Sequence, residues 1–217
     1  MSRILINLIL ITTLCSSANC GNSTKKLSVF RKHYSKEDKI DREAVLRKKA
    51  KDALAFCKSH NYNTNFCILI DLGMHSGLKR FFVWDFSKKE ISHRFLVSHG
   101  CGRMPWSWTW SRDNAKLSNE DGSHCSAAGK YKIGKRGYSN WGIKVNYLLY
   151  GLEATNSNAY ARKIVLHSWQ DVGDDELYPE GTPEGWGCPA ISNHALKLLD
   201  PKLKKSKKSV LLWIYKS

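Results

Sequence analysis

Short hydrophobic runs alternate with polar, glycine-containing turns through most of the chain after residue 65. The runs Phe66–Ile70, Phe81–Trp84 and Ile91–Val97 have the length of strands and are separated by turn residues. We therefore predict a three-stranded meander in this region. The same pattern predicts later strands at Gly129–Ile133, Gly142–Leu149, Lys163–His167 and Ser209–Tyr215.

A helical spacing of apolar residues precedes the first strand. Ser35 is followed by acidic residues typical of a first helical turn, and apolar residues recur at roughly helical spacing up to Cys57. Those apolar residues are Ala44, Leu46, Ala50, Leu54 and Phe56. A second, short helix is predicted over Ser192–Leu199, with Ser192 as its N-cap.

Two long segments lack periodicity and are predicted to be loops. They are residues 100–127 and residues 170–187, both rich in turn-forming residues. Loops of this length inside a compact domain usually carry function. The chain contains no internal repeat and no interdomain linker. Residues 36–217 are therefore predicted to form one domain, mainly β (α+β), with a flanking N-terminal helix.

The N-terminus has the layout of a secretory signal. Arg3 precedes the apolar run Ile4–Leu14, and small residues follow at 16–18. This run is shorter than the roughly 20 residues that a membrane span needs. We predict a signal peptide over residues 1–18, a disordered basic leader over 19–35, and export to the periplasm or cell envelope.

The mature chain is predicted to have no transmembrane segment, because no later apolar stretch is long enough to cross a bilayer. Lipidation at Cys20 is not favoured. A lipoprotein signal needs an apolar residue three positions before the modified cysteine, and Ser17 stands there.

Basic residues outnumber acidic ones, 35 Lys and Arg against 19 Asp and Glu, which gives a net charge of +16. This balance points to a polyanionic partner. Export disfavours nucleic acid and favours an anionic cell wall surface. A lysine run after the second predicted helix is interpreted either as a docking site for that wall or as a solvated loop. The run consists of Lys202, Lys204, Lys205, Lys207 and Lys208.

Six of the seven cysteines lie after the predicted signal peptide. In an oxidising compartment the ordinary expectation is disulfides. The simplest pairs are Cys57 with Cys67 and Cys101 with Cys125. This arrangement leaves Cys188 free for chemistry.

Cys188 and His167 form a candidate catalytic pair. His167 ends a predicted strand, and Cys188 follows Gly187 in a glycine-rich turn. A cysteine nucleophile needs a base within hydrogen-bond reach, and glycine lets the backbone approach a substrate closely. The amides of Gly187 and Cys188 could receive an oxyanion. Taken alone, this pair is a weak signal, and a buried disulfide cysteine and a strand histidine are the favoured interpretation.

From about residue 44 onward the chain resembles the YkuD-like L,D-transpeptidase catalytic domain, in particular the branch labelled murein L,D-transpeptidase catalytic domain family. The matching motifs occur in the family's order. They are Ile68–Asp71, Phe81–Asp85, Val97–Gly100, Leu117–Asn119, Ser123–Ser126, Gly129–Tyr131, Tyr150–Glu153, Asn158–Arg162, Val165–His167 and Gly185–Ala190.

The resemblance implies a compact β-sandwich-like fold and a cysteine mechanism. Cys188 falls on the family's nucleophile, His167 on its base, and Ser168 on the residue whose backbone carbonyl orients that base. Gly187 falls on the oxyanion-binding turn. Further residues are expected to line the substrate cleft, namely His99, Asn119, His124 and Trp186.

The sequence departs from the wider family beside the nucleophile. Trp186 stands where the wider family has a second histidine, and Pro189 follows the cysteine in place of Arg or Asn. No residue is therefore assigned to the carboxylate of the substrate.

The implied function is a peptidoglycan L,D-transpeptidase that acts on stem peptides through a thioester and needs no metal and no cofactor. Two alternatives stay open. One is an L,D-carboxypeptidase, in which water resolves the same thioester. The other is a non-enzymatic wall-binding protein that keeps the fold. A zinc peptidase is disfavoured by the absence of a tight ligand pattern, although His99, His124 and His167 could converge.

Overall fold

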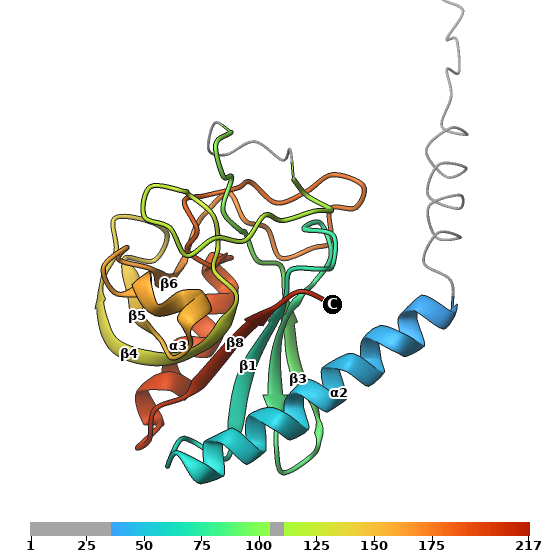
Figure 1. The fold of residues 1–217 in the computed structure, drawn as a ribbon, viewed down its shortest axis with the longest axis vertical. Helices are drawn as coiled ribbons and strands as arrows, with labels where there is room; N and C mark the ends of the chain where they lie inside the picture. Colours follow the sequence, from blue (N-terminus) through green and yellow to red (C-terminus); the bar gives the residue numbers. More distant parts are fainter. Residues whose placement is uncertain (1–35, 105–110) are drawn as a thin grey trace, which may run out of the picture. The chain divides into compact units, whose positions relative to one another are not determined.

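A computed structural model describes residues 36–104 and 111–217, which build one eight-stranded sheet flanked by helices (Figure 1). The strand order is β3-β2-β1-β8-β4-β5-β6-β7. The strands are β1 Phe66–Asp71, β2 Phe81–Asp85, β3 Glu90–Phe95, β4 Gly129–Tyr138, β5 Val145–Gly151, β6 Val165–Ser168, β7 Ala190–Ile191 and β8 Leu211–Tyr215. The mainly β fold class predicted from the sequence is confirmed.

The last strand of the chain lies in the middle of the sheet. β8 pairs in parallel with β1 on one side and antiparallel with β4 on the other. It therefore joins the meander β1–β3 to the half formed by β4–β7. Leu211, Leu212 and Ile214 are almost completely buried, as a central strand covered on both faces requires.

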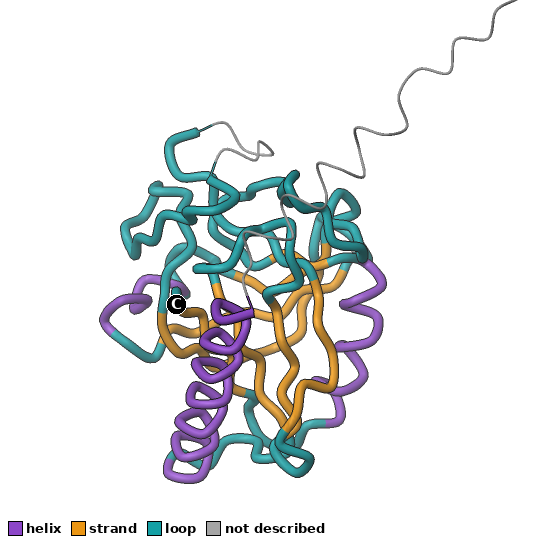
Figure 2. The backbone as a smooth tube through the Cα atoms, turned by 90° about the vertical axis from the view of Figure 1, so that its right-hand side faces the viewer, coloured by secondary structure: helices purple, strands orange, loops and turns teal. Residues whose placement is uncertain are grey.

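Alternate residues of the central strands pack into two separate cores. On β1, Ile68 and Ile70 face one core, whereas Cys67 and Leu69 face the other. Helix α3 (Asn193–Lys205) packs into the first core, and α2 (Lys36–Ser59) packs into the second. Figure 2 shows the strands with a helix on either side.

Both predicted helices are present. α2 matches its prediction closely, and Ser192 caps α3 by accepting a hydrogen bond from the Ala195 amide at 3.0 Å. α3 runs beyond the predicted end at Leu199 and continues through Pro201. Leu203 explains the difference, because its burial in the first core stabilises an additional turn.

Three further elements differ from the predictions. β4 continues beyond Ile133 to Tyr138, because it forms a hairpin with β5. The two-residue strand β7 and the 3₁₀ helix η1 (Ala154–Ala159) were not predicted. The loops before β4 and before β7 were predicted, and their described parts gather at one end of the sheet (Figure 1).

The two predicted disulfides are absent, and this corrects the sequence prediction. Cys57, Cys67, Cys101, Cys125 and Cys188 are all free thiols. Cys57 and Cys67 pack as small apolar side chains in the core beneath α2. Burial raises the pKa of the Cys57 thiol to about 11, which keeps it protonated.

The predicted signal peptide, the leader and Cys20 lie outside the described residues. In the part of the chain that the structure describes, no helix is long and apolar enough to cross a membrane.

Candidate active site

Cys188 lies on a turn whose shape depends on glycine. Gly187 has a φ of +97°, in the left-handed region that glycine favours. A Cβ at Gly187 would lie 2.4 Å from the carbonyl oxygen of Cys125, so the backbones approach more closely than any side chain permits. This position therefore excludes other residues for reasons of both conformation and space.

The segment that follows β3 holds this turn through backbone hydrogen bonds. The Gly185 amide donates to the His99 carbonyl at 2.8 Å, and the Cys101 amide donates to the Gly185 carbonyl at 2.7 Å. The buried Ser126 hydroxyl donates to the Gly187 carbonyl at 3.1 Å and accepts from the Gly100 amide at 3.1 Å. Ser126 is a positioning residue that the sequence analysis did not single out.

The amides of Gly187 and Cys188 have no acceptor among the described residues. Among residues 36–104 and 111–217, neither amide donates to a protein acceptor. Two neighbouring N–H groups on a rigid turn can receive a negatively charged oxygen. The oxyanion role of Gly187 and Cys188 stays a prediction.

His167 lies near the end of β6 with a fixed ring orientation. Its Nδ1 lies 3.0 Å from the Ser168 carbonyl oxygen, which can only accept, so Nδ1 carries the proton. Nε2 is left as the basic nitrogen. The Ser168 hydroxyl accepts from the Ile143 amide at 3.0 Å and so holds this strand end against the start of β5.

The sheet brings Cys188 and His167 to the same region, without a hydrogen bond between their side chains in the described part of the chain. His167 pairs with Ala190 in the parallel β6–β7 register, which places Cys188 beside Val165. The Cys188 Sγ accepts from the Val165 amide at 3.4 Å. No hydrogen bond joins Sγ to the His167 ring among the described residues. Catalytic hydrogen bonds often tighten only when substrate binds.

Electrostatics keep both groups neutral in the free protein. Burial raises the pKa of the Cys188 thiol, although the Val165 amide and Arg162 oppose this shift. Burial also lowers the pKa of His167, although its bond to Ser168 opposes the change. These shifts favour a neutral thiol and a neutral imidazole in the free protein.

Trp186 and His124, both predicted to bind substrate, form a stacked pair next to the cysteine turn. Their ring centroids lie 4.6 Å apart with an interplanar angle of 12°. Trp186 is 61% exposed and directly precedes Gly187. The pair therefore offers an aromatic surface at the mouth of the site.

The side chain and the backbone carbonyl of Asn119 are engaged within the protein. Its amide nitrogen donates to the Ala154 carbonyl and the Ser157 hydroxyl, each at 3.0 Å. Its two oxygens accept from the backbone and side chain of Asn158. The structure thus places Asn119 as a clamp between a loop and η1.

His99 is completely buried and belongs to a polar network behind the site. The Arg80 guanidinium donates to its Nδ1 at 2.7 Å, and its Nε2 donates to the Ser111 hydroxyl at 3.0 Å. Ser111 in turn donates to the Glu184 carboxylate from its amide and its hydroxyl. Glu184 directly precedes the cysteine turn, so the network supports that turn from inside the protein.

Burial shifts the pKa values of the ionisable residues in this network. Burial lowers the pKa of Arg80 to about 9 and raises the pKa of Glu184. Burial and the nearby guanidinium lower the pKa of His99 well below its ordinary value, which keeps the ring neutral. A neutral His99 can accept from Arg80 at one nitrogen and donate from the other.

Arg162 is a functional candidate that the sequence analysis did not assign. Its guanidinium donates to the Ser118 carbonyl at 2.9 Å and the Cys125 carbonyl at 2.6 Å. A Cβ at Gly187 would lie 3.2 Å from its Nη2, so the charge lies beside the oxyanion turn. The motif Asn158–Arg162, which carries part of the family resemblance, was the signal that could have identified it.

The described residues contain no cluster of three or more His, Cys, Asp or Glu side chains suited to a metal ion. His99, His124 and His167 therefore do not converge in the way that a zinc peptidase would require.

The L,D-transpeptidase catalytic domain family model matches residues 36–215. This match spans most of the chain, and the protein belongs to that family.

Solved structures with a similar fold include an L,D-transpeptidase from Xylanimonas cellulosilytica, at 11% identity and a TM-score of 0.40. The helical cell shape determining protein Pgp2 from Campylobacter jejuni is similar at 12% identity and a TM-score of 0.44. The alignments cover 70% and 72% of this chain but only 60% and 49% of those chains. No curated protein sequence matches the chain.

Proposed function

We propose that this protein is a cysteine L,D-transpeptidase that acts on stem tetrapeptides of peptidoglycan through a thioester acyl-enzyme. The observation that carries the proposal is the turn at Cys188, where a thiol stands beside two unpaired amides. Family membership supplies the reaction class. The orientation of His167 supports its role as the base.

The first half-reaction follows from these positions. His167 Nε2 takes the thiol proton as Cys188 Sγ attacks the carbonyl of the third stem residue. The amides of Gly187 and Cys188 bind the oxygen that becomes negative. His167 then gives its proton to the leaving amine, the terminal D-residue departs, and a thioester remains.

The second half-reaction forms the cross-link. An amine from a neighbouring stem loses a proton to His167 and attacks the thioester carbonyl. The S–C bond breaks, the thiol regains its proton, and a new amide joins the two stems.

The same geometry supports a proposal for which residues contact the substrate. The exposed ring of Trp186, stacked on His124, packs against the stem peptide. Arg162 supplies positive charge near the oxyanion turn, where the family's usual arginine or asparagine is missing. His99 and Asn119 act by positioning the loops and not by touching substrate.

The working location proposed for the protein is the cell envelope, reached by export. The predicted signal over residues 1–18 and the positive charge both fit a partner with an anionic wall surface.

The test is incubation of the full mature chain with purified tetrapeptide muropeptides and a labelled D-amino acid, followed by mass spectrometry. Transpeptidation exchanges the terminal residue for the label. Simple loss of the terminal residue would instead indicate a carboxypeptidase. No change in any muropeptide would contradict the enzyme proposal.

A further inference from the structure

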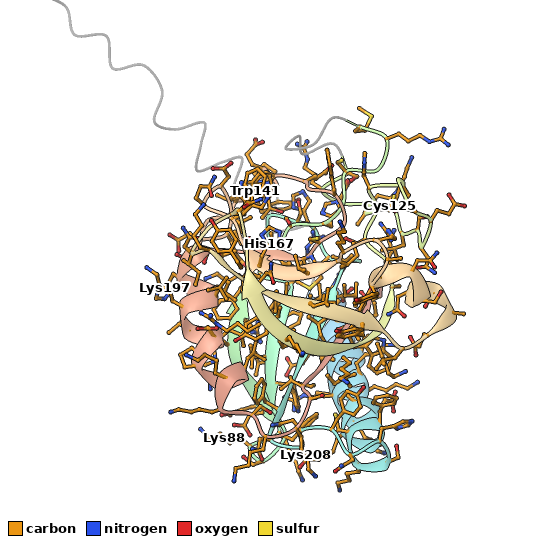
Figure 3. The ribbon with its side chains drawn as sticks, turned by 90° about the vertical axis from the view of Figure 1, so that its left-hand side faces the viewer. Lys88, Cys125, Trp141, His167, Lys197 and Lys208 are labelled. Atoms are coloured by element: carbon orange, nitrogen blue, oxygen red, sulfur yellow. The ribbon has the colours of Figure 1, made fainter. Side chains whose placement is uncertain are left out.

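A basic pocket lies at the end of the molecule away from the candidate active site. It has a volume of about 380 Å³ and is formed by β4, β5, the end of α3 and the loop before β8. Figure 3 shows the two ends, with His167 among the loops at one and Lys208 at the other. Its walls include four lysines, Lys132, Lys135, Lys207 and Lys208.

The four lysines have no carboxylate partner of their own. The ion pairs among the described residues involve other side chains, and the four lysines are exposed. Asp200, which bonds to the pocket residue Tyr147, is already engaged by Arg136 at 2.7 Å and by the Tyr147 hydroxyl at 2.6 Å. The pocket therefore has uncompensated positive charge, which favours an anionic ligand.

One wall of the pocket is aromatic. Tyr150 lines the pocket and stacks on Tyr160, with ring centroids 5.3 Å apart and an interplanar angle of 12°. The Lys132 ammonium lies 5.7 Å from the centre of the Tyr150 ring. A charged group and an aromatic ring thus line the same pocket.

The backbone conformation of β4 determines where the Tyr150 ring lies. The β4–β5 register shifts between Ile133 and Arg136, so that Gly134 and Lys135 form an irregularity in the strand. A Cβ at Gly134 would lie 2.3 Å from Tyr150 Cε2, so only glycine lets the ring lie against β4.

The opposite rim is also fixed. The Asn63 side chain donates to the Ser206 hydroxyl at 2.7 Å, and the backbone amide of Asn63 donates to the Ser209 carbonyl at 2.9 Å. These bonds hold the loop that carries Lys207 and Lys208. A pocket with a fixed rim needs little reordering to bind its ligand.

We propose that this pocket binds an acidic glycan, a sugar chain that carries carboxylate or phosphate groups. A sugar ring has an apolar C–H face that can pack on Tyr150, and its anionic group can reach the lysines. The volume falls in the range of small-ligand pockets, which suits one or two ring-sized units. A flat bilayer could touch the lysine tips but could not enter to reach the ring.

The site refines the docking role that the sequence suggested for the lysine run. Lys207 and Lys208 line the pocket, whereas Lys202, Lys204 and Lys205 belong to the last turn of α3. Two lysines from β4 complete the site. The proposal does not rest on the cysteine chemistry, because the two sites use separate residues.

The test compares two variants of equal charge. In the full mature chain, the four pocket lysines are replaced by glutamine in one variant. In the other, the same change is made at four exposed lysines outside the pocket, Lys48, Lys51, Lys88 and Lys197. Binding of fluorescent polygalacturonate is measured by anisotropy. The pocket variant should lose roughly tenfold or more in affinity, and the control less than about threefold. Equal losses would overturn the proposal.

The ring is tested separately. Tyr150→Leu should weaken polygalacturonate binding several-fold, Tyr150→Phe should bind like the wild type, and neither should alter binding of polyglutamate, which has no sugar rings. Equal affinity for both polymers, with no effect of Tyr150→Leu, would reduce the site to general charge attraction and contradict the proposal. Binding to phosphatidylglycerol vesicles but not to polygalacturonate would assign the pocket to a membrane and overturn it.

Turnover of a small soluble muropeptide separates this site from the catalytic one. It should be unchanged in the pocket variant, whether or not the wild type proves to be a transpeptidase. If the fourfold variant fails to fold, the pair Lys207→Gln and Lys208→Gln in the loop gives a milder form of the same test, with at least a threefold loss expected.

Discussion

The Nδ1 of His167 donates to the carbonyl oxygen of Ser168 over 3.0 Å, and this bond determines which ring nitrogen can act as a base. The bond leaves Nε2 unprotonated in the neutral ring. It depends on backbone geometry at the end of β6, where the Ser168 hydroxyl is itself held by the Ile143 amide. The tautomer of the base is therefore a property of the fold.

Replacement of Cys188 by alanine should abolish turnover while the protein stays folded. In the proposed mechanism the thiol forms the acyl-enzyme, and loss of a nucleophile commonly costs on the order of 10³-fold or more in rate. Product formation from tetrapeptide muropeptides is measured by mass spectrometry, and folding by circular dichroism. Cys101→Ala is the matched control, since Cys101 has no role in the proposed reaction. Full activity in Cys188→Ala would refute the mechanism.

Replacement of Gly187 by alanine should damage both the turn and the reaction. The Cβ of alanine would lie 2.4 Å from the Cys125 carbonyl oxygen, on a backbone with a φ of +97°. The substitution should therefore lower the free energy of unfolding by about 1–3 kcal/mol. The rate should fall by at least about tenfold, because the oxyanion amides are displaced.

Gly185→Ala is the control for that variant, since a Cβ there meets no atom within 4 Å. Denaturation curves and turnover should both remain near wild type in Gly185→Ala. Equal damage in the two variants would mean that loop flexibility, and not the shape of the turn, is the important property.

Alkylation of Cys188 by iodoacetamide should be slow at neutral pH and accelerate toward high pH. Burial places the pKa of this thiol above its ordinary value of 9.0, so the thiolate forms only above that pH. Cys57 and Cys67 are fully buried and should react still more slowly. Rates are followed by peptide mapping under non-reducing conditions. Rapid labelling of Cys188 at pH 6 would show a resting thiolate and contradict the neutral pair.

Protein stability should fall as the pH drops below about 6.5, in part through His99. The folded pKa of this ring lies well below the unfolded value of 6.5, so the unfolded state binds more protons in the window between them. Protonation would remove the acceptor for the Arg80 guanidinium. Urea denaturation at pH 7.5, 6.0 and 5.0 measures the slope.

The variant His99→Asn isolates that contribution. The amide oxygen of asparagine can accept from Arg80 without titrating, so the slope between pH 6 and 5 should decrease by about 1 kcal/mol per pH unit. His194→Asn, at an exposed position of α3, is the surface control and should change the slope much less. An unchanged slope in His99→Asn would show that other groups dominate the acid sensitivity.

Local patterns were sufficient to predict most of the sheet but not its shortest parts. Runs such as Phe81–Trp84 carry their own strand signal, since aromatic and β-branched residues recur there between turn residues. β7 has just two residues, and it exists because β6 offers it a partner in parallel register. The irregularity at Gly134 and the extension of α3 past Pro201 likewise depend on packing with distant residues.

The candidate site likewise contains residues that local motifs indicate and residues that only the fold brings together. Cys188 and His167 could be proposed because each lies in a recognisable motif at the end of an element. Arg80 could not, because its partners are Val97 and His99, brought to it by the pairing of β2 and β3. Ser126 was also missed, since its hydroxyl bridges two turns that are 87 residues apart, at positions 100 and 187.

The central place of β8 has a consequence for how the chain reaches its native state. A growing polypeptide that stops short of residue 211 has two half-sheets with open inner edges and nothing to bridge them. Pairing β1 with β8 closes a loop of more than a hundred residues, so the decisive contact forms late and slowly. Until then the exposed edges are vulnerable to pairing with other chains.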